Sequence, residues 1–169
     1  MEPRRFVYVT LHRPSNVDAV ESLQAIAEAL KAIAGHHPVV FPVHPRTRSR
    51  LREFGLLAGL EAHPGLRLVE PLGYLDNLCL AEQASCVLTD SGGLQEETTF
   101  LRVPCLTLRP NTERPVTISQ GSNRLTALAG LRADLEEAIR RRDSGEALPA
   151  PPLWDGRAGE RIADCLLER

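Results

Sequence analysis

Short apolar runs alternate with longer segments of helical periodicity along the whole chain, and this alternation limits the fold more than any other feature. Strand-like runs, nearly all apolar or β-branched, occur at Phe6–Leu11, Val39–Val43, Leu66–Val69, Cys86–Thr89 and Cys105–Leu108. Continuous hydrophobicity is typical of parallel strands that helices cover on both faces. We therefore predict an α/β fold, a single doubly wound Rossmann-like domain with a parallel sheet of about five or six strands.

The segments between these runs have helical patterns. The first helix is predicted to begin after Asp18, because Glu21 completes a capping-box pattern and apolar residues then recur on one face. Further helices are predicted at Arg48–Phe54, Leu75–Ala84, Leu94–Leu101, Ala133–Arg142 and Arg157–Leu167. Residues 143–152 are rich in Pro, Gly and small residues, which indicates a linker to a terminal helix over residues 156–167 of the 1–169 domain.

The composition favours one globular domain. The chain has 169 residues, of which 43% are hydrophobic, and this is enough to bury a core. A net charge of −2 argues against nucleic acid as a partner. The chain has neither a membrane-spanning apolar stretch nor a signal-peptide pattern at its start, so we expect a cytoplasmic protein with no membrane partner.

The cysteines do not have the spacing of metal ligands. None of them forms a C-x-x-C pair, and three lie in apolar runs, which favours buried thiols over disulfides. We therefore expect no metal site. The cysteines are Cys79, Cys86, Cys105 and Cys165.

Polar and charged residues gather where the predicted strands end. These loops are residues 12–16, 44–48, 70–74, 89–93 and 109–115. The loops at the opposite edge carry no comparable cluster. Because ligands of doubly wound sheets bind outside the carboxyl ends of the strands, the sequence predicts a ligand site at this edge.

The motif Ser91-Gly92-Gly93 passes from a predicted strand into a predicted helix. Glycines let a ligand approach the backbone, and a helix start offers free N–H groups and the positive end of the helix dipole. The motif therefore predicts an anion site, most simply for a diphosphate, with Ser91 as the N-cap. An ordinary capped turn is the alternative interpretation.

Glu97 and Arg114 are the candidates for contacts beside this anion. Glu96 and Glu97 lie about 100° apart around a helix, so only one of them can face the site. Glu97 is the better placed, and its carboxylate suits the hydroxyls of a ribose. Both glutamates could instead complement the helix dipole. Arg114 is the candidate clamp for the diphosphate, the alternative being an ordinary surface pair with Glu113.

His12 and His44 each follow a predicted strand and could act as acid, base or donor near neutral pH. A histidine satisfied by backbone contacts is the alternative for both. His36, His37 and His63 fall at the opposite edge and are predicted to be structural.

Six motifs occur along the chain in the same order as in a known protein family. They are Thr10–Asn16, Pro42–Arg46, Glu70–Leu75, Thr89–Glu97, Thr112–Pro115 and Gly121–Leu125. The chain resembles the C-terminal half of the non-hydrolysing UDP-N-acetylglucosamine 2-epimerases, which have a GT-B fold of two Rossmann-like domains around a cleft. The resemblance implies interconversion of UDP-GlcNAc and UDP-ManNAc by elimination and re-addition of UDP, without an added cofactor. Such an isomerase would serve the biosynthesis of cell-envelope polysaccharide.

The resemblance also implies roles for individual residues. His12 matches a catalytic histidine, and the residues that match UDP ligands are Ser91, Gly92, Gly93, Glu97 and Arg114. Other possible substrate-binding residues are Arg13, His44, Arg46, Leu75 and Asn77. The loop Leu72–Asn77 matches the segment that lines the uracil pocket. Family members often have an aromatic residue where Asn77 stands, so Tyr74 or the loop backbone would have to replace its stacking on the base.

The family takes its remaining catalytic carboxylates from an N-terminal domain, whereas this chain begins at the first strand of the second domain. We therefore expect the chain alone to bind UDP without turnover, with that domain as a partner in cis or in trans. Ile162, Cys165 and Leu166 would be exposed on the terminal helix, so we also expect a homo-oligomer. Two other functions stay open, a GT-B glycosyltransferase and a non-enzymatic UDP-sugar-binding module.

Overall fold

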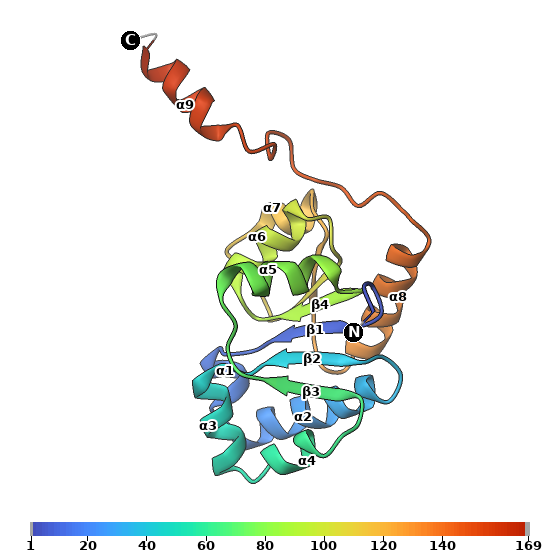
Figure 1. Cartoon of the computed structure of the whole chain (residues 1–169). Coiled ribbons are helices and arrows are strands. Elements are labelled where there is room, and N and C mark those ends of the chain that lie inside the picture. The colour runs from blue at the N-terminus through green and yellow to red at the C-terminus, as the bar shows by residue number, and fades with distance from the viewer. Residues whose placement is uncertain (1, 168–169) are drawn as a thin grey trace.

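Six parallel strands form one sheet at the centre of the computed structural model, which describes residues 2–167 (Figure 1). They are β1 (Val7–Thr10), β2 (Val39–Pro42), β3 (Leu66–Val69), β4 (Cys86–Thr89), β5 (Cys105–Leu108) and β6 (Asn123–Thr126). The order β3-β2-β1-β4-β5-β6 confirms the predicted doubly wound arrangement. Chain order reverses between β1 and β4. Residues 1, 168 and 169 of the predicted domain lie outside the described residues.

Helices cover both faces of this sheet. The larger core cluster joins one sheet face to α2 (Val20–Ala34), α3 (Pro45–Glu53), α4 (Leu57–Glu61) and α8 (Leu131–Asp143). The second cluster joins the opposite face to α5 (Tyr74–Gln83) and α6 (Gly92–Phe100). Val7 and Val9 belong to the first cluster and Tyr8 to the second, as expected for successive residues of a strand.

The remaining described helices are α1 (Pro14–Val17), α7 (Pro115–Ser119) and α9 (Ala158–Leu167). The first five strands lie where the apolar runs predicted them, with ends that differ by at most one residue. The pattern missed β6, since Asn123 and Arg124 interrupt any apolar run. It also missed α1, α4 and α7, which are too short to show a helical period.

The predicted capping box at Asp18 and Glu21 is wrong. Asp18 ends α1, and α2 begins at Val20 with Ala19 as an N-cap that makes no side-chain hydrogen bond. The Asp18 carboxylate instead accepts hydrogen bonds from Arg46 at 2.9 and 2.5 Å. The ion pair with Arg46 therefore takes the place of the local cap.

The prediction of buried thiols is correct for only two of the four cysteines. Cys86 and Cys105 are buried in strands, whereas Cys79 on α5 and Cys165 on α9 are exposed. Within residues 2–167, no group of three or more His, Cys, Asp or Glu residues could hold a metal ion. No helix in this part of the chain is long and apolar enough to cross a membrane.

The C-terminal segment extends away from the sheet (Figure 1). Asp143, predicted as the start of a linker, is the last residue of α8, and residues 144–157 contain no helix or strand. The helix α9 that follows has no buried residue. Ile162 and Leu166 are 61% and 67% exposed.

Candidate functional site

The carboxyl ends of β1 and β4 lie side by side at the centre of the sheet. The two strands pair in register from Val7 with Cys86 to Thr10 with Thr89. The hydroxyl groups of Thr10 and Thr89 lie 2.7 Å apart, within hydrogen-bond distance. Residues 11–13 and 90–93 therefore meet at the point where chain order reverses, the usual ligand position in such sheets.

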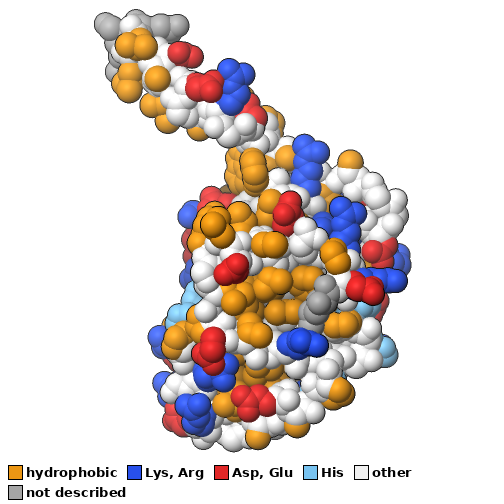
Figure 2. All heavy atoms as spheres, viewed as in Figure 1, with side chains coloured by type: hydrophobic (Ala, Val, Ile, Leu, Met, Phe, Trp, Pro, Cys, Tyr) orange, Lys and Arg blue, Asp and Glu red, His pale blue; other side chains and the backbone are white. Residues whose placement is uncertain are grey.

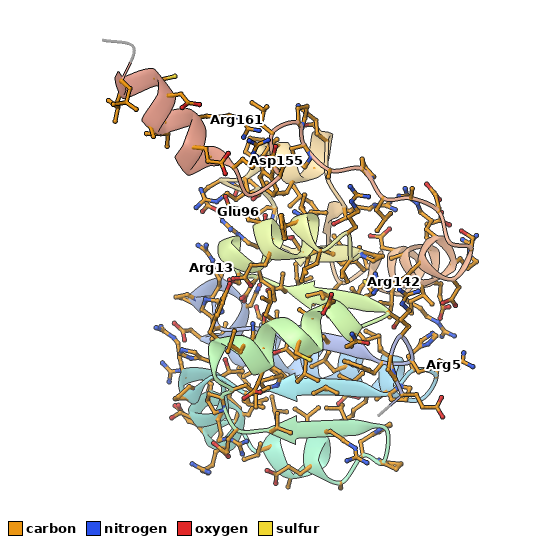
Figure 3. All side chains as sticks on the ribbon, turned by 45° about the horizontal axis from the view of Figure 1, so that its top comes forward. Arg5, Arg13, Glu96, Arg142, Asp155 and Arg161 are labelled. Atoms are coloured by element: carbon orange, nitrogen blue, oxygen red, sulfur yellow. The ribbon has the colours of Figure 1, made fainter. Side chains whose placement is uncertain are left out.

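An open cavity of about 250 Å³ lies at this point. Its lining includes predicted site residues from both segments. The lining residues are Thr10, His12, Asn77, Ser91, Gly93, Leu94 and Glu97. Figure 3 shows Arg13 and Glu96 at the same end of the sheet, whereas Arg5 and Arg142 lie at the opposite end.

The start of α6 forms one wall of the cavity. Ser91 is the N-cap, as predicted, and its Oγ accepts a hydrogen bond from the Leu94 amide at 3.5 Å. Gly92 and Gly93 are the first helical residues rather than a turn, and neither has a positive φ. A Cβ atom at either position would meet nothing within 4 Å. The glycines thus leave open space over the first amides of the helix, which suits an anion.

Asp90 is a buried carboxylate that the sequence analysis did not select. It is 0% exposed and accepts hydrogen bonds from the amides of His12 and Arg13 and from the Asn16 side chain, at 2.9 to 3.1 Å. Burial raises the pKa of the Asp90 carboxyl, but the hydrogen bonds from His12, Arg13 and Asn16 outweigh burial and hold the pKa below its ordinary value. The position of Asp90 directly after an apolar strand is the sequence feature that could have identified it as a site residue.

His12 is oriented by this carboxylate. Its Nδ1 lies 3.0 Å from Asp90 Oδ1, which leaves Nε2 as the ring nitrogen available to a ligand. The imidazole is 40% exposed and lines the cavity. The ring of His44 lies nearby, with 5.5 Å between the two ring centroids.

Glu97 and Glu96 have different surroundings, as the sequence analysis expected. Glu97 faces the cavity. Burial, and secondarily the charge of Glu96, raises the pKa of the Glu97 carboxyl. Glu96 Oε1 lies instead 3.0 Å from Arg114 Nε, outside the cavity.

Arg114 lies at the rim of the site. The alternative that pairs it with Glu113 is wrong, because Arg109 takes that carboxylate with two hydrogen bonds of 2.7 Å. The Arg114 side chain is 44% exposed and is not among the residues that line the cavity. The ion pair with Glu96 connects the guanidinium directly to α6.

Gln95, a second residue that the sequence analysis did not assign, joins α6 to the loop that carries Arg114. Its Nε2 donates to the Ser91 carbonyl at 3.1 Å, and its Oε1 accepts from Thr112 Oγ1 at 2.6 Å and from Asn123 Nδ2 at 3.2 Å. Thr112 Oγ1 in turn accepts from the Arg114 amide at 3.0 Å. The position of Gln95 on the buried face of a predicted helix is the sequence feature that could have identified it.

The other candidates after β1 and β2 serve mainly to hold loops. The Arg13 side chain donates from Nε to the Asp90 carbonyl at 3.1 Å. His44 is the N-cap of α3 and accepts the Arg46 amide at 3.2 Å. Arg46 itself is held by Asp18, so its guanidinium lies outside the cavity.

The predicted loop Leu72–Asn77 is partly helical. Residues 74–77 form the first turn of α5, with Gly73 as its N-cap. Leu75 is 76% exposed and does not line the cavity. Asn77 does line it, and its Oδ1 accepts a hydrogen bond from the Tyr8 hydroxyl at 2.5 Å.

Comparisons with known proteins agree with one another. A family model described as UDP-N-acetylglucosamine 2-epimerase matches residues 1–167. The UDP-N-acetylglucosamine 2-epimerase of Methanocaldococcus jannaschii is 40% identical over 163 residues, which cover 95% of this chain and 44% of that protein. A UDP-2,3-diacetamido-2,3-dideoxy-D-glucuronate 2-epimerase of Pseudomonas aeruginosa is 35% identical, with 95% and 44% covered.

A solved structure is equally similar. The crystal structure of the Methanocaldococcus jannaschii UDP-GlcNAc 2-epimerase in complex with UDP-GlcNAc and UDP superposes with a TM-score of 0.87 and 38% identity. The superposition covers 99% of this chain and 46% of that one. The chain thus spans less than half the length of these relatives.

Proposed function

The chain belongs to the UDP-N-acetylglucosamine 2-epimerase family, and from this premise we propose that it is the UDP-binding half of an enzyme that interconverts UDP-GlcNAc and UDP-ManNAc. One observation carries the proposal. The cavity between β1 and β4 combines an open helix start, the carboxylate of Glu97 and the imidazole of His12. The helix start suits the diphosphate of a nucleotide, Glu97 suits its ribose, and His12 suits the bond to the sugar that breaks.

The diphosphate is bound at the start of α6. The amides of Gly92 and Gly93 and the hydroxyl of Ser91 are donors, and the helix dipole favours the negative charge. Arg114 supplies a further fork of donors by leaving Glu96. That exchange is cheap because the ion pair is nearly half exposed on both sides.

The ribose is bound by Glu97. This residue follows Gly93 by four positions, so it lies on the same side of the helix and roughly 6 Å further along its axis. This distance along the helix matches the distance between the diphosphate and the ribose hydroxyls of one nucleotide. A carboxylate accepts hydrogen bonds from both hydroxyl groups.

His12 and Asp90 assist cleavage of the bond between the sugar and UDP. In the elimination the proton on C2 is removed, the C1–O bond breaks, and UDP leaves with the electron pair while 2-acetamidoglucal is formed. In its imidazolium form, His12 donates the Nε2 proton to the departing diphosphate and becomes neutral, while ionised Asp90 accepts the Nδ1–H hydrogen bond and stabilises the charged ring in that orientation. Re-addition of UDP with the proton on the opposite face of C2 completes the epimerisation.

The groups that exchange the C2 proton are proposed to lie in the other half of the cleft. The chain covers 44% of the Methanocaldococcus jannaschii relative, and its cavity holds one carboxylate, already assigned to the ribose. The 169-residue chain should therefore bind UDP without turnover. Deuterium incorporation at C2 of UDP-GlcNAc in heavy water tests this, because exchange by the chain alone would contradict it.

Calorimetric titration tests the binding site itself. We expect UDP and UDP-GlcNAc to bind at least about tenfold more tightly than ADP or UMP. Gly93→Val places a side chain in the open space over the amides and should weaken UDP binding about 100-fold or more. Gly159→Val is the matched control, since Gly159 in α9 is equally open but remote, and it should bind normally. Equal binding of ADP, or normal binding by Gly93→Val, would contradict the proposal.

A further inference from the structure

Tyr8 is a buried tyrosine whose hydroxyl contacts Asn77, a residue that lines the cavity. Its ring packs between β2, α5 and α6 in the second core cluster and is 0% exposed. The hydroxyl donates to Asn77 Oδ1 at 2.5 Å, across 69 positions of sequence. A tyrosine of the core thus fixes the Oδ1 atom of Asn77, whose side chain lines the cavity.

The hydroxyl is kept in its donor form. Burial, and secondarily the negative charge of Glu97, raises the pKa of Tyr8 well above its ordinary value. Because Oδ1 receives this hydrogen bond, the amide group of Asn77 is fixed with its NH2 turned away from Tyr8. No acceptor within residues 2–167 takes a hydrogen bond from that NH2 group. Asn77 therefore offers the cavity two donors in a set orientation.

Uracil presents a carbonyl oxygen at position 4 of its ring, where cytosine presents an amino group. A donor fixed next to the base discriminates between the two, because only uracil can accept the hydrogen bond. Asn77 in α5 and Glu97 in α6 line the same cavity, and the two helices are in contact. A nucleotide whose ribose is bound by Glu97 therefore has Asn77 within the space available to its base.

We propose that Asn77 determines the specificity for uracil by donating a hydrogen bond to the carbonyl at position 4, and that Tyr8 is the positioning residue that orients the Asn77 amide. The inference rests on the proposed function, because it requires a nucleotide with its ribose on Glu97. Recognition of the base then depends on a hydrogen bond, and the aromatic ring of Tyr8 contributes through its hydroxyl from within the core.

Dissociation constants for UDP and CDP, measured calorimetrically with the full chain, test the inference. The wild type should prefer UDP by about tenfold. Tyr8→Phe keeps the ring but frees the amide to rotate, so UDP binding should persist while the preference falls to about threefold or less. Asn77→Asp replaces both donors with an acceptor of the same size, so CDP should become the preferred ligand. The control Asp76→Asn alters the neighbouring exposed residue in the same turn and should retain the preference of the wild type.

The ratio of the two constants separates this role from a structural one, since loss of stability would weaken UDP and CDP binding alike. Equal binding of UDP and CDP by the wild type would overturn the inference and leave the proposed function standing. So would a preference for UDP that survives in Asn77→Asp. Failure of the wild type to bind UDP at all would contradict the proposed function as well.

Discussion

Asp90 is the residue on which the geometry of the candidate site most depends. Its carboxylate is fully buried at the end of β4 and holds the backbone of the loop after β1 through the amides of His12 and Arg13. It also contacts the ring of His12. The same side chain therefore fixes the loop and orients the imidazole.

Asp90→Asn should lower the free energy of unfolding by about 3 kcal/mol at pH 7, since the amide cannot accept all the hydrogen bonds of the carboxylate. The pKa of Asp90 in the folded state lies below its ordinary value, so its contribution is complete above that value, about 3.9, and is lost as the pH falls through the folded pKa. The difference between the two proteins should therefore shrink below about pH 4. Urea denaturation at pH 7 and pH 3 measures it.

Asp76→Asn is the control, because this carboxylate is exposed and should matter little at either pH. An Asp90→Asn protein as stable as the wild type at pH 7, or one that shows the same deficit at both pH values, would contradict the assignment.

At the level of elements, α6 connects the proposed anion site to the loop that follows β5. Gln95 is fully buried and accepts hydrogen bonds from Thr112 and Asn123 while it donates to the Ser91 carbonyl. A chain of hydrogen bonds thus runs from the N-cap of α6 to the backbone of Arg114. The position of Arg114 relative to the helix start is set by this buried network.

Gln95→Leu should lower the free energy of unfolding by about 3 kcal/mol, because the Thr112 hydroxyl loses its acceptor, the Ser91 carbonyl loses a donor, and the NH2 group of the buried Asn123 keeps only its hydrogen bond to Thr117. UDP binding should also weaken, since the loop of Arg114 loses its attachment. Gln24→Leu makes the same change on the exposed face of α2 and should alter neither property. Urea denaturation and calorimetry measure the two effects, and an equal response of the two variants would refute the role of the network.

The sequence predicted the elements that apolar patterning specifies and missed those that polar contacts specify. Strands β1 to β5 are apolar runs, whereas β6 pairs with β5 around the buried Asn123, whose partners are Thr107, Thr117 and Gln95. No local pattern encodes such partners. The capping box at Asp18 failed for a related reason, because Arg46 lies 28 residues further along the chain.

The same distinction holds for the candidate site. Ser91, Gly93 and Glu97 could be placed from the sequence because one helix fixes their spacing. Contacts between segments could not, since Asp90 lies 78 residues from His12 and becomes its neighbour only through the pairing of β1 with β4. The ion pair of Arg114 with Glu96 likewise depends on how α6 and the loop of Arg114 meet.

At the level of the whole molecule, α9 is the part that lacks a packing partner within the described chain. Hydrophobic side chains lie along this helix as it extends from the body (Figure 2). Ile162, Leu166 and Leu167 are 61%, 67% and 84% exposed, and Leu153 in the preceding segment is 69% exposed. Exposed apolar surface of this kind favours association.

Deletion of residues 153–169 should leave the free energy of unfolding unchanged within about 0.5 kcal/mol, because the described part of this segment contains no buried side chain. We expect the full chain to self-associate as its concentration rises and the shortened chain to stay monomeric. Size-exclusion chromatography at several concentrations and urea denaturation measure both. A strictly monomeric full chain, or a shortened chain that is clearly less stable, would argue against this account of α9.

The proposed function requires that the diphosphate of a uridine nucleotide lies on the backbone at the start of α6. A crystal structure of the chain with UDP would show where that diphosphate lies. We expect phosphate oxygens about 3 Å from the amides of Gly92 and Gly93, with the ribose hydroxyls bound by Glu97. A structure in which UDP occupies another surface, such as the opposite end of the sheet near Arg142, and leaves this corner free would contradict it.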